Sequence, residues 1–226
     1  MDIEGINIER LNHDCFKIKA QNKIIYLDPY QIQPNEAADL ILVTHEHADH
    51  LSLQDIEKLL KPGTTIVTIP DCQSTLARIG HKISQVVLIE PFQKKEVQGI
   101  TIETIPAYNI NKFRSPNMPF HPKQDGRVGF IVTLNGKRIY HAGDTDCIPE
   151  MQQLKNIDIA LLPVSGTYVM TVEEAVQAVK MIRPKIAIPM HYAAVVGTDA
   201  DAEKFKSLAT QYCQILVIPK SFSPEK

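Results

Sequence analysis

Short apolar runs separated by polar turns recur along the chain, and each run predicts a strand. Four to eight aliphatic or β-branched residues between turn signals are typical of a buried strand. We therefore expect strands at residues 15–18, 23–27, 40–43, 65–69, 85–89, 100–105, 127–134, 137–141, 157–161, 186–189 and 215–218. Asn135 and Gly136 separate two of these runs. This pair predicts a type I′ hairpin turn, because both residues tolerate a positive φ.

A second pattern, with apolar residues three or four positions apart, predicts helices at residues 52–60, 72–79, 171–182 and 199–212. The apolar face of the third helix consists of Val172, Ala175, Val176, Val179 and Ile182. Such a face packs on a core while the opposite face meets water. Thr171 with Glu174, and Ser52 with Asp55, have the spacing of a capping box that begins a helix.

The order of these elements indicates a mixed α/β (α+β) fold. The chain has 226 residues, of which 44% are hydrophobic, enough for one large core or two intimately packed halves. No repeat, low-complexity stretch or linker interrupts it, so we treat residues 1–226 as a single domain.

Charge and cysteine content limit the partners and the cellular compartment that we expect for the protein. The formal net charge is −2, so no global basic field recruits nucleic acid, and a nucleic-acid partner is not expected. The four cysteines form no CxxC pair and are expected to be reduced thiols of a cytoplasmic protein. No export signal and no apolar run of about 18 residues is present, so no membrane association is expected. A homo-oligomer is compatible with the sequence.

The strongest chemical signal is the segment Thr44-His45-Glu46-His47-Ala48-Asp49-His50, directly after the apolar run at residues 40–43. Imidazole and carboxylate are ligands of zinc and neighbouring metals, and a loop at a strand end can present them together. A single histidine at a strand end is usually an ordinary polar residue, but three with an aspartate in six positions predict a metal site. The spacing excludes the His-Glu-x-x-His pattern of helical metalloproteases.

Two further candidates also follow apolar strands. Asp144 comes after the run at residues 138–141 and a glycine, and His191 comes after the run at residues 185–190. An aspartate after glycine is ordinarily a turn residue. One edge of an α/β fold, however, would bring these side chains together with the first cluster, and such edges are the usual place for a binding site.

These motifs, in this order, resemble the metallo-β-lactamase fold hydrolases. His45-x-His47-x-Asp49-His50, then Gly143-Asp144-Thr145, then His191 match the family pattern. The chain is most similar to the branch that contains ascorbate-6-phosphate lactonase and many uncharacterised metal-dependent hydrolases. Residues 11–16 look like the opening Gly-His-x-x-Phe strand of that branch, and the resemblance covers nearly the whole chain. It implies a four-layer αββα sandwich.

The resemblance also implies roles for single residues. His45 and His47 would bind one ion with a third histidine, Asp49, His50 and His191 would bind a second, and Asp144 would bridge both, with a hydroxide between them as nucleophile. Asp49 and Asp144 would be the catalytic carboxylates. Two cations close together lower the pKa of a shared water and stabilise the charge that develops on the attacked group. The cofactor would be two divalent metal ions; zinc is the first choice, and manganese or iron would also fit.

One position departs from the family pattern. The third histidine of the first site is expected near residue 109, where this chain has Asn109; the next histidine is His121. Either the loop between them folds back so that His121 is the ligand, or Asn109 binds through its amide oxygen, or only one metal is bound strongly. We favour His121 and place Asn109 in an outer shell.

The segment 107–126 is long for a loop in a compact domain, and such loops are often functional. It carries Lys112, Arg114 and Lys123, with Arg127 just after it. A solvated loop is the simpler interpretation; the alternative is a lid in which Arg114 and Arg127 bind an anionic substrate. Ser165, in the turn at residues 163–170, is a further candidate for substrate binding.

His13 and His141 lie at strand ends near the motifs, so both are candidates for orienting the ligands from an outer shell. Together the observations predict a hydrolase of a small, anionic substrate, acting with a metal-bound hydroxide on an ester, lactone, amide or phosphodiester. The alternatives are a nuclease of the same fold and a metal-binding protein of this fold without hydrolytic activity, which Asn109 would favour.

Overall fold

The computed structural model describes residues 1–34 and 36–221. The chain divides into two compact units. The N-terminal unit is Met1–Glu90 with the described residues from Ile218 on, and the C-terminal unit is Pro91–Val217. The prediction of a single domain over residues 1–226 stays a prediction.

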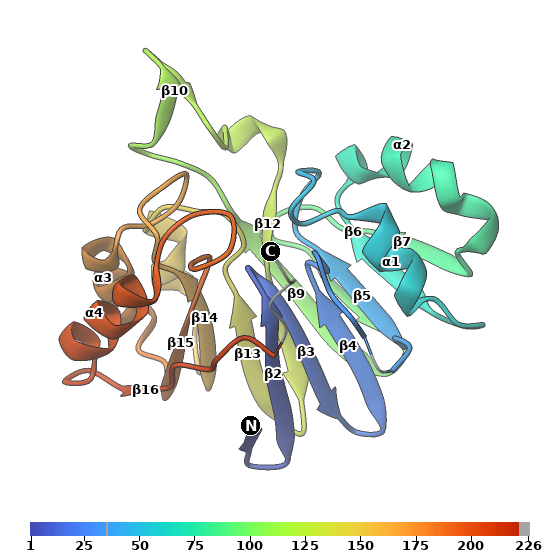
Figure 1. The fold of residues 1–226 in the computed structure, drawn as a ribbon, viewed down its shortest axis with the longest axis horizontal. Helices are drawn as coiled ribbons and strands as arrows, with labels where there is room; N and C mark the ends of the chain where they lie inside the picture. The colour runs from blue at the N-terminus through green and yellow to red at the C-terminus, as the bar shows by residue number, and fades with distance from the viewer. Residues whose placement is uncertain (35, 222–226) are drawn as a thin grey trace. The chain divides into compact units, whose positions relative to one another are not determined.

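The N-terminal unit is built on a mixed sheet with helices against it (Figure 1). Its strands, within the described residues, follow the sheet in chain order: β1 (Asp2–Ile3), β2 (Ile6–Asn12), β3 (Cys15–Ala20), β4 (Lys23–Leu27), β5 (Leu40–Val43), β6 (Thr65–Thr68) and β7 (Gln85–Leu88). The pairs from β1 to β4 are antiparallel and those from β4 to β7 are parallel. The helical segments are α1 (Leu53–Leu59), η1 (Pro70–Cys72), α2 (Gln73–Leu76) and η2 (Ala77–Lys82).

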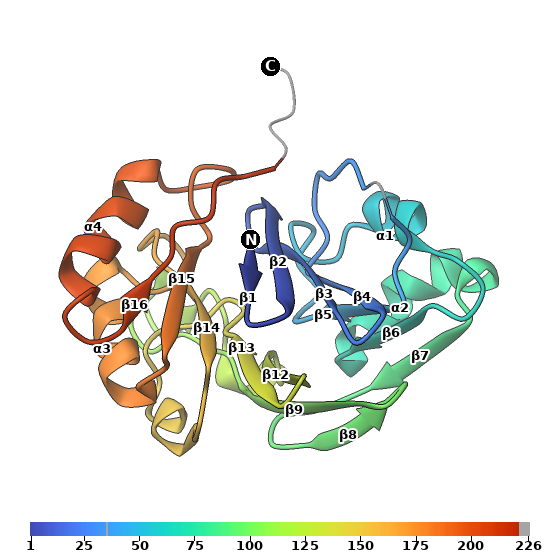
Figure 2. The ribbon, with the colours of Figure 1, turned by 90° about the horizontal axis from the view of Figure 1, so that it is seen from below.

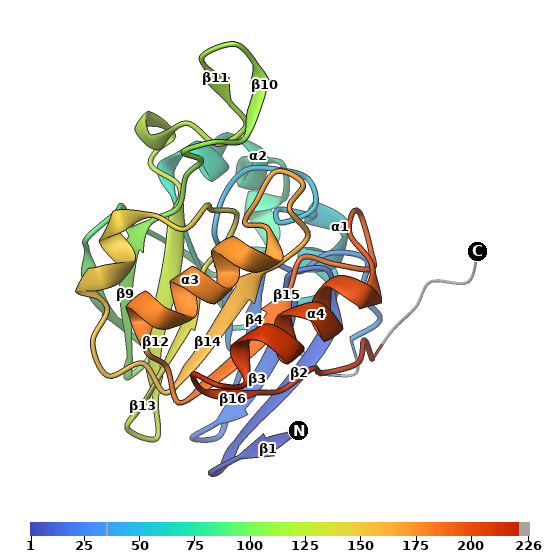
Figure 3. The same ribbon diagram turned by 90° about the vertical axis from the view of Figure 1, so that its left-hand side faces the viewer.

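The C-terminal unit contains a second sheet, in the order β16-β15-β14-β13-β12-β9-β8. These strands are β8 (Lys94–Val97), β9 (Ile100–Pro106), β12 (Val128–Leu134), β13 (Lys137–His141), β14 (Ile159–Pro163), β15 (Ile186–Met190) and β16 (Gln214–Ile215). Helices α3 (Val172–Ile182) and α4 (Asp199–Ala209) pack side by side over β14 and β15 (Figures 2 and 3). The segment 107–126 forms the hairpin β10 (Phe113–Ser115) and β11 (Met118–Pro119), which projects from this unit, and η3 (Lys123–Asp125); η4 (Pro149–Gln153) follows β13.

Several parallel strands of the two units are buried along their full length, although β7 is partly exposed. Every residue of β5, β6 and β14 is buried. Strands covered on both faces are continuous hydrophobic runs rather than alternating ones. Because parallel strands end at the same edge, the residues that follow β4 and β5 meet in one unit, and those that follow β13 and β15 meet in the other.

Most predicted elements are confirmed, three of them to the residue: β4, β5 and β13. Strand β2 was not predicted, because its buried positions include Arg10 and Asn12, which hide the apolar alternation. Strands β1, β8, β10 and β11 were also missed; β8 is charged, and the others are two or three residues long.

Several other boundaries differ from the prediction, among them that of β14, which is Ile159–Pro163 instead of 157–161. The helix expected at residues 72–79 is a short α-helix between two 3₁₀ turns, the helix from residue 199 ends at Ala209, and the last strand is Gln214–Ile215. No helix among the described residues combines the length and apolar character needed to cross a membrane.

Local signals for turns and helix starts are largely confirmed. Asn135 and Gly136 have φ values of 48° and 72° and join β12 to β13, as a type I′ turn requires. Thr171 and Glu174 form a full capping box at the start of α3. At α1 the Ser52 side chain accepts from the Asp55 N–H, but the Asp55 carboxylate accepts from backbone N–H groups of residues 31 and 32. Asp55 therefore ties the loop after β4 to this helix.

The capping box of α3 gives a stability prediction. Thr171→Ala removes one of the two reciprocal hydrogen bonds and should lower the free energy of unfolding by about 0.5–2 kcal/mol. Denaturant unfolding followed by circular dichroism measures this change. Gln177→Ala, at an exposed position of the same helix, is the matched control and should change stability by less than about 0.5 kcal/mol. Equal effects of the two changes would contradict a role for the cap.

Candidate metal centre

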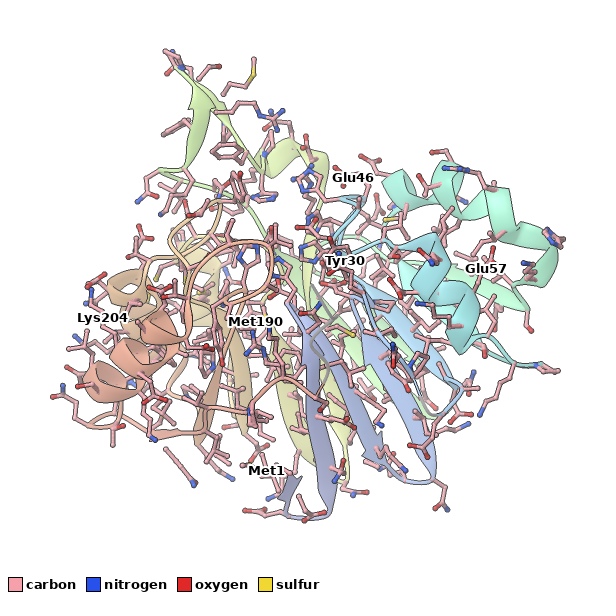
Figure 4. All side chains as sticks on the ribbon, viewed as in Figure 1. Met1, Tyr30, Glu46, Glu57, Met190 and Lys204 are labelled. Carbon is pink, nitrogen blue, oxygen red and sulfur yellow. The ribbon has the colours of Figure 1, made fainter. Side chains whose placement is uncertain are left out.

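The loop after β5 holds the histidine motif of the N-terminal unit in a tight turn. The N–H groups of His50 and Leu51 both donate to the His47 carbonyl, at 3.0 and 2.7 Å. The rings of His45 and His50 lie 4.0 Å apart between centroids, and those of His45 and His47 lie 4.7 Å apart. Figure 4 labels Tyr30 and Glu46, which lie beyond the carboxyl ends of β4 and β5 at the same end of that sheet. The motif is therefore presented at a strand edge, as predicted.

Asp28, the residue after β4, fixes which ring nitrogen carries the proton in His50 directly and in His45 through Thr44. Its fully buried carboxylate accepts from the Thr44 N–H at 2.8 Å, from Thr44 Oγ1 at 2.7 Å and from His50 Nδ1 at 2.8 Å. Because the Thr44 hydroxyl proton points to Asp28, Thr44 Oγ1 accepts from His45 Nδ1 at 3.0 Å. Both rings thus carry their proton on Nδ1 and present an Nε2 lone pair. Sequence reasoning gave Asp28 no role.

The turn between β2 and β3 adds two more donor side chains. His13 and Asp14 are fully buried, and their ligand atoms and that of His50 lie within 4.8 Å of one another. Asp14 Oδ2 is 3.9 Å from His50 Nε2, and Asp49 Oδ2 is 3.6 Å from His13 Nε2. His13, expected in an outer shell, is therefore surrounded by candidate ligands, and Asp14 is a candidate that the motif search missed.

Asp144 lies at the centre of the candidate ligands in the C-terminal unit. It follows β13 after Gly143, whose φ is 63°, and it is 3% exposed. Its Oδ2 lies 3.2 Å from His121 Nε2, and its Oδ1 lies 3.4 Å from His191 Nε2. The two oxygens of one carboxylate therefore face two different histidines.

Asn109 orients His121. The Asn109 amide nitrogen donates to Asp146 Oδ1 and to the Tyr168 carbonyl, both of which only accept, so the amide oxygen must point the other way. That oxygen accepts from the His121 N–H and from His121 Nδ1, both at 2.9 Å. His121 therefore holds its proton on Nδ1 and presents Nε2. This geometry supports the expectation that Asn109 acts from an outer shell.

Ser165 has the same relation to His191, the residue after β15. The Ser165 hydroxyl donates to the Thr167 carbonyl at 3.3 Å and lies 3.0 Å from His191 Nδ1, which donates to it in turn. His141 differs: its Nδ1 accepts from the Gly143 N–H at 3.3 Å, so it fixes the turn before Asp144. Substrate binding by Ser165 stays a prediction.

The donor set fits divalent metal ions. Two donors bound at about 2.0 Å to one tetrahedral zinc lie about 3.3 Å apart, close to the 3.2 and 3.4 Å around Asp144. With each Nδ1 proton donated to its own acceptor, the Nε2 lone pairs of His121 and His191 face the carboxylate oxygens of Asp144, an arrangement that costs electrostatic energy unless a cation lies between them. Neutral rings and a carboxylate with a cation between them avoid that cost. The Nδ1–H groups are held as in most protein metal sites.

Asp146, two residues after Asp144, organises the loop that carries Asn109. Its carboxylate accepts from the N–H groups of Ile110 and Asn111 at 2.7 and 2.9 Å, and Lys112 Nζ lies 3.2 Å from it. Sequence reasoning missed Asp146, although it completes the run Gly-Asp-Thr-Asp.

Ion pairs compensate most of the positive charge expected on the segment 107–126. Lys112 pairs with Glu174 at 2.6 Å, Lys123 with Glu150 at 2.6 Å, and buried Arg127 with Asp125 at 3.4 Å. Arg114, on the exposed hairpin, donates to the Phe120 carbonyl and stacks over its ring. The lid interpretation therefore depends on Arg114 more than on the other cations.

The Asp146 network yields a prediction about local order. Asp146→Ala removes Oδ2, the oxygen that accepts from both backbone N–H groups, which should cost about 1–3 kcal/mol. Hydrogen exchange should accelerate at Ile110 and Asn111 in particular. Asp125→Ala, in the same segment but half-buried and paired with Arg127, is the control and should leave both amides protected. Unchanged protection of both amides in the Asp146 variant would contradict the role of Asp146 in ordering this loop.

The chain is similar to known proteins over nearly its full length. A family model described as "Beta-lactamase superfamily domain" matches residues 7–191. A UPF0173 metal-dependent hydrolase of Pyrococcus abyssi is 33% identical, with 94% of this chain and 96% of the relative covered. Another from Thermoplasma acidophilum is 32% identical, over 98% and 99%.

A crystal structure of a putative metal-dependent hydrolase from Parabacteroides distasonis superposes with a TM-score of 0.81 at 31% identity, covering 96% of this chain and 94% of the other. The α/β class and the metallo-β-lactamase fold predicted from the sequence are thereby confirmed. The chain belongs to the β-lactamase superfamily and, within it, to the UPF0173 metal-dependent hydrolases.

Proposed function

We propose that the protein hydrolyses a small-molecule ester, lactone, amide or phosphodiester with two divalent metal ions, zinc first. The ligand assignment follows the family resemblance, with His121 taken as the third histidine of the first site: His45, His47 and His121 for one ion, Asp49, His50 and His191 for the other, and Asp144 for both. Relatives over nearly the full length of the chain are named metal-dependent hydrolases, which supports the reaction class.

One observation carries the proposal of two ions. Asp144 directs Oδ2 to one histidine and Oδ1 to another, each at the separation expected of two ligands on a common ion. A carboxylate that served a single ion would not need a neutral imidazole at each oxygen. Asp14 and His13 are further donors beside His50 that this proposal adds to the family pattern.

The residues of this chain have defined tasks in the proposal. Bound divalent ions would acidify a water and stabilise the negative charge that develops on the attacked group. Asp28, Thr44, Asn109 and Ser165 keep the Nδ1 protons of the four histidines in place, so that each Nε2 stays a lone-pair donor. A ligand that is fixed in orientation and tautomer binds a metal without reorganising first.

A substrate screen with metal removal tests the function. The protein as purified should turn over at least one compound among lactones, phosphodiesters, thioesters and single-stranded RNA. Chelator treatment should abolish this activity, zinc or manganese should restore it, and Asp144→Ala should not respond to added metal. Turnover of RNA alone would favour a nuclease. Two bound ions without any turnover would favour a metal-binding protein without hydrolytic activity.

A pair of variants tests the position of the third histidine. His121→Ala removes a proposed ligand and should weaken one of the two metal sites by more than 100-fold. Asn109→Ala leaves the proposed ligand in place but removes the acceptor of the His121 Nδ1 proton, and it should lower the metal affinity about 10- to 100-fold. Competition with a chromogenic chelator gives both affinities. The reverse order would identify Asn109 as the ligand and remove His121 from the site.

Arg114 is the residue on which we base a preference for anionic substrates. Arg114→Ala should raise KM for a carboxylate- or phosphate-bearing ester about tenfold, the lower end for one charge-assisted hydrogen bond at an exposed site, and leave a neutral analogue unchanged. Arg127→Ala is the matched control: its buried guanidinium already pairs with Asp125, so it should affect stability more than the ratio of the two KM values. Equal KM changes for both substrates would argue against Arg114 as an anion-binding residue.

A further inference from the structure

We propose that the C-terminal unit has a second binding site, for a small ligand that carries two or more phosphate charges, at the end of its sheet remote from Asp144. A cavity of about 1090 Å³ lies there. Its charged lining consists of Arg138, Lys155, Lys180, Arg183, Lys185 and Asp158. None of these residues belongs to the proposed metal centre.

The topology of the sheet separates the two sites. Strands β13, β14 and β15 are parallel. Asp144 and His191 follow the carboxyl ends of β13 and β15, whereas Arg138 is the second residue of β13 and Lys185 directly precedes β15. The cavity is therefore at the amino ends of the same strands. A ligand in it would contact none of the proposed metal ligands of this unit.

The charge of the cavity is unusual for this protein. Five cationic side chains and one acidic side chain line it, in a chain whose formal net charge is −2. The carboxyl end of α3 attracts cations, which accounts for Lys180 and Arg183. It does not account for Arg138, Lys155 and Lys185, which come from three other segments. Convergence of several elements on one cavity indicates a ligand rather than a helix cap.

Asp158 gives the floor of the cavity a fixed geometry. Its carboxylate accepts from the backbone N–H of Arg138 at 2.9 Å and from Lys185 Nζ at 2.7 Å. Burial raises the pKa of Asp158, but these partners lower it by more, so the pKa lies below its ordinary value and the group is ionised at neutral pH. Asp158 therefore pairs with Lys185, and the Arg138 guanidinium pairs with Glu103. The remaining cations of the lining, Lys155, Lys180 and Arg183, give the site the excess of positive charge that an anion would neutralise.

Arg183 is placed at a costly position. It follows α3 with φ 54° and ψ 54°, and its N–H donates to the Val179 carbonyl. Glycine is the usual residue at such a left-handed helix end, because a side chain costs about 1 kcal/mol there. The Arg183 side chain is exposed at the cavity, where its guanidinium can form the paired hydrogen bonds that suit a phosphate.

A titration with inorganic pyrophosphate tests the proposal. The full-length protein as purified is labelled with ¹⁵N, and amide shifts are followed against an NaCl titration of equal ionic strength. We expect saturable shifts at Arg138, Asn156, Arg183 and Lys185 that NaCl does not reproduce. Shifts near Asp144 and His191 would report binding at the metal centre separately.

Arg183 offers a matched pair of variants. Arg183→Gly removes the charge and the strain of a side chain at a positive φ, so this variant should be at least as stable as the natural protein. Its dissociation constant for pyrophosphate should rise about tenfold. Arg183→Lys keeps the charge and should bind within a few-fold of the natural protein. An absence of saturable shifts at the cavity, shifts that NaCl reproduces, or unchanged affinity in Arg183→Gly would each overturn the proposal. Because no metal ligand is altered, failure here leaves the hydrolase proposal standing.

Discussion

The hydrogen bond from Nδ1 of each candidate histidine is the interaction on which the metal chemistry depends. His45, His50, His121 and His191 all donate this proton to an acceptor that is itself fixed: Thr44, Asp28, Asn109 and Ser165. The four acceptors are a hydroxyl, a carboxylate, an amide and a second hydroxyl. They share only the ability to take a proton from Nδ1, and the common result is a neutral ring with its Nε2 lone pair available.

Strand geometry supplies the second constraint. Continuous aliphatic strands are buried on both faces and leave only their ends for polar chemistry. In each unit the parallel strands deliver loops to one edge. The histidine motif at residues 45–50, Asp144 and His191 follow such strands, whereas His121 comes from the segment 107–126. At the amino ends of β13 to β15 the same arrangement gathers cations instead, so one set of strands has chemically opposite environments at its two ends.

Local features of the sequence predicted the framework well. An uninterrupted apolar run predicted β5 to the residue, the Asn-Gly turn predicted where β13 begins, and the dense histidine motif predicted a metal site in the loop after β5. The partners that define the site depend on contacts across the chain. Asp28 meets His50 22 residues later, and Lys112 meets Glu174 62 residues later. No local pattern encodes such contacts.

The same limit explains what sequence reasoning left undecided at Asn109 and His121. Twelve residues of irregular chain separate them, and only the hydrogen bonds of Asn109 to Asp146 and Tyr168 fix which way its amide oxygen points. The basic character of the segment 107–126 was similarly overestimated, because the acidic partners of Lys112 and Lys123 lie outside it.

The central claim is that Asp144 bridges two metal ions, and anomalous X-ray diffraction from crystals of the zinc-loaded protein tests it most directly. Data collected on both sides of the zinc edge locate each ion independently of any assumed ligand set. We predict two anomalous peaks, one bonded to each oxygen of Asp144, with His121 Nε2 at one ion and His191 Nε2 at the other. A single peak, or two peaks of which either lies beyond bonding distance of Asp144, would contradict the account.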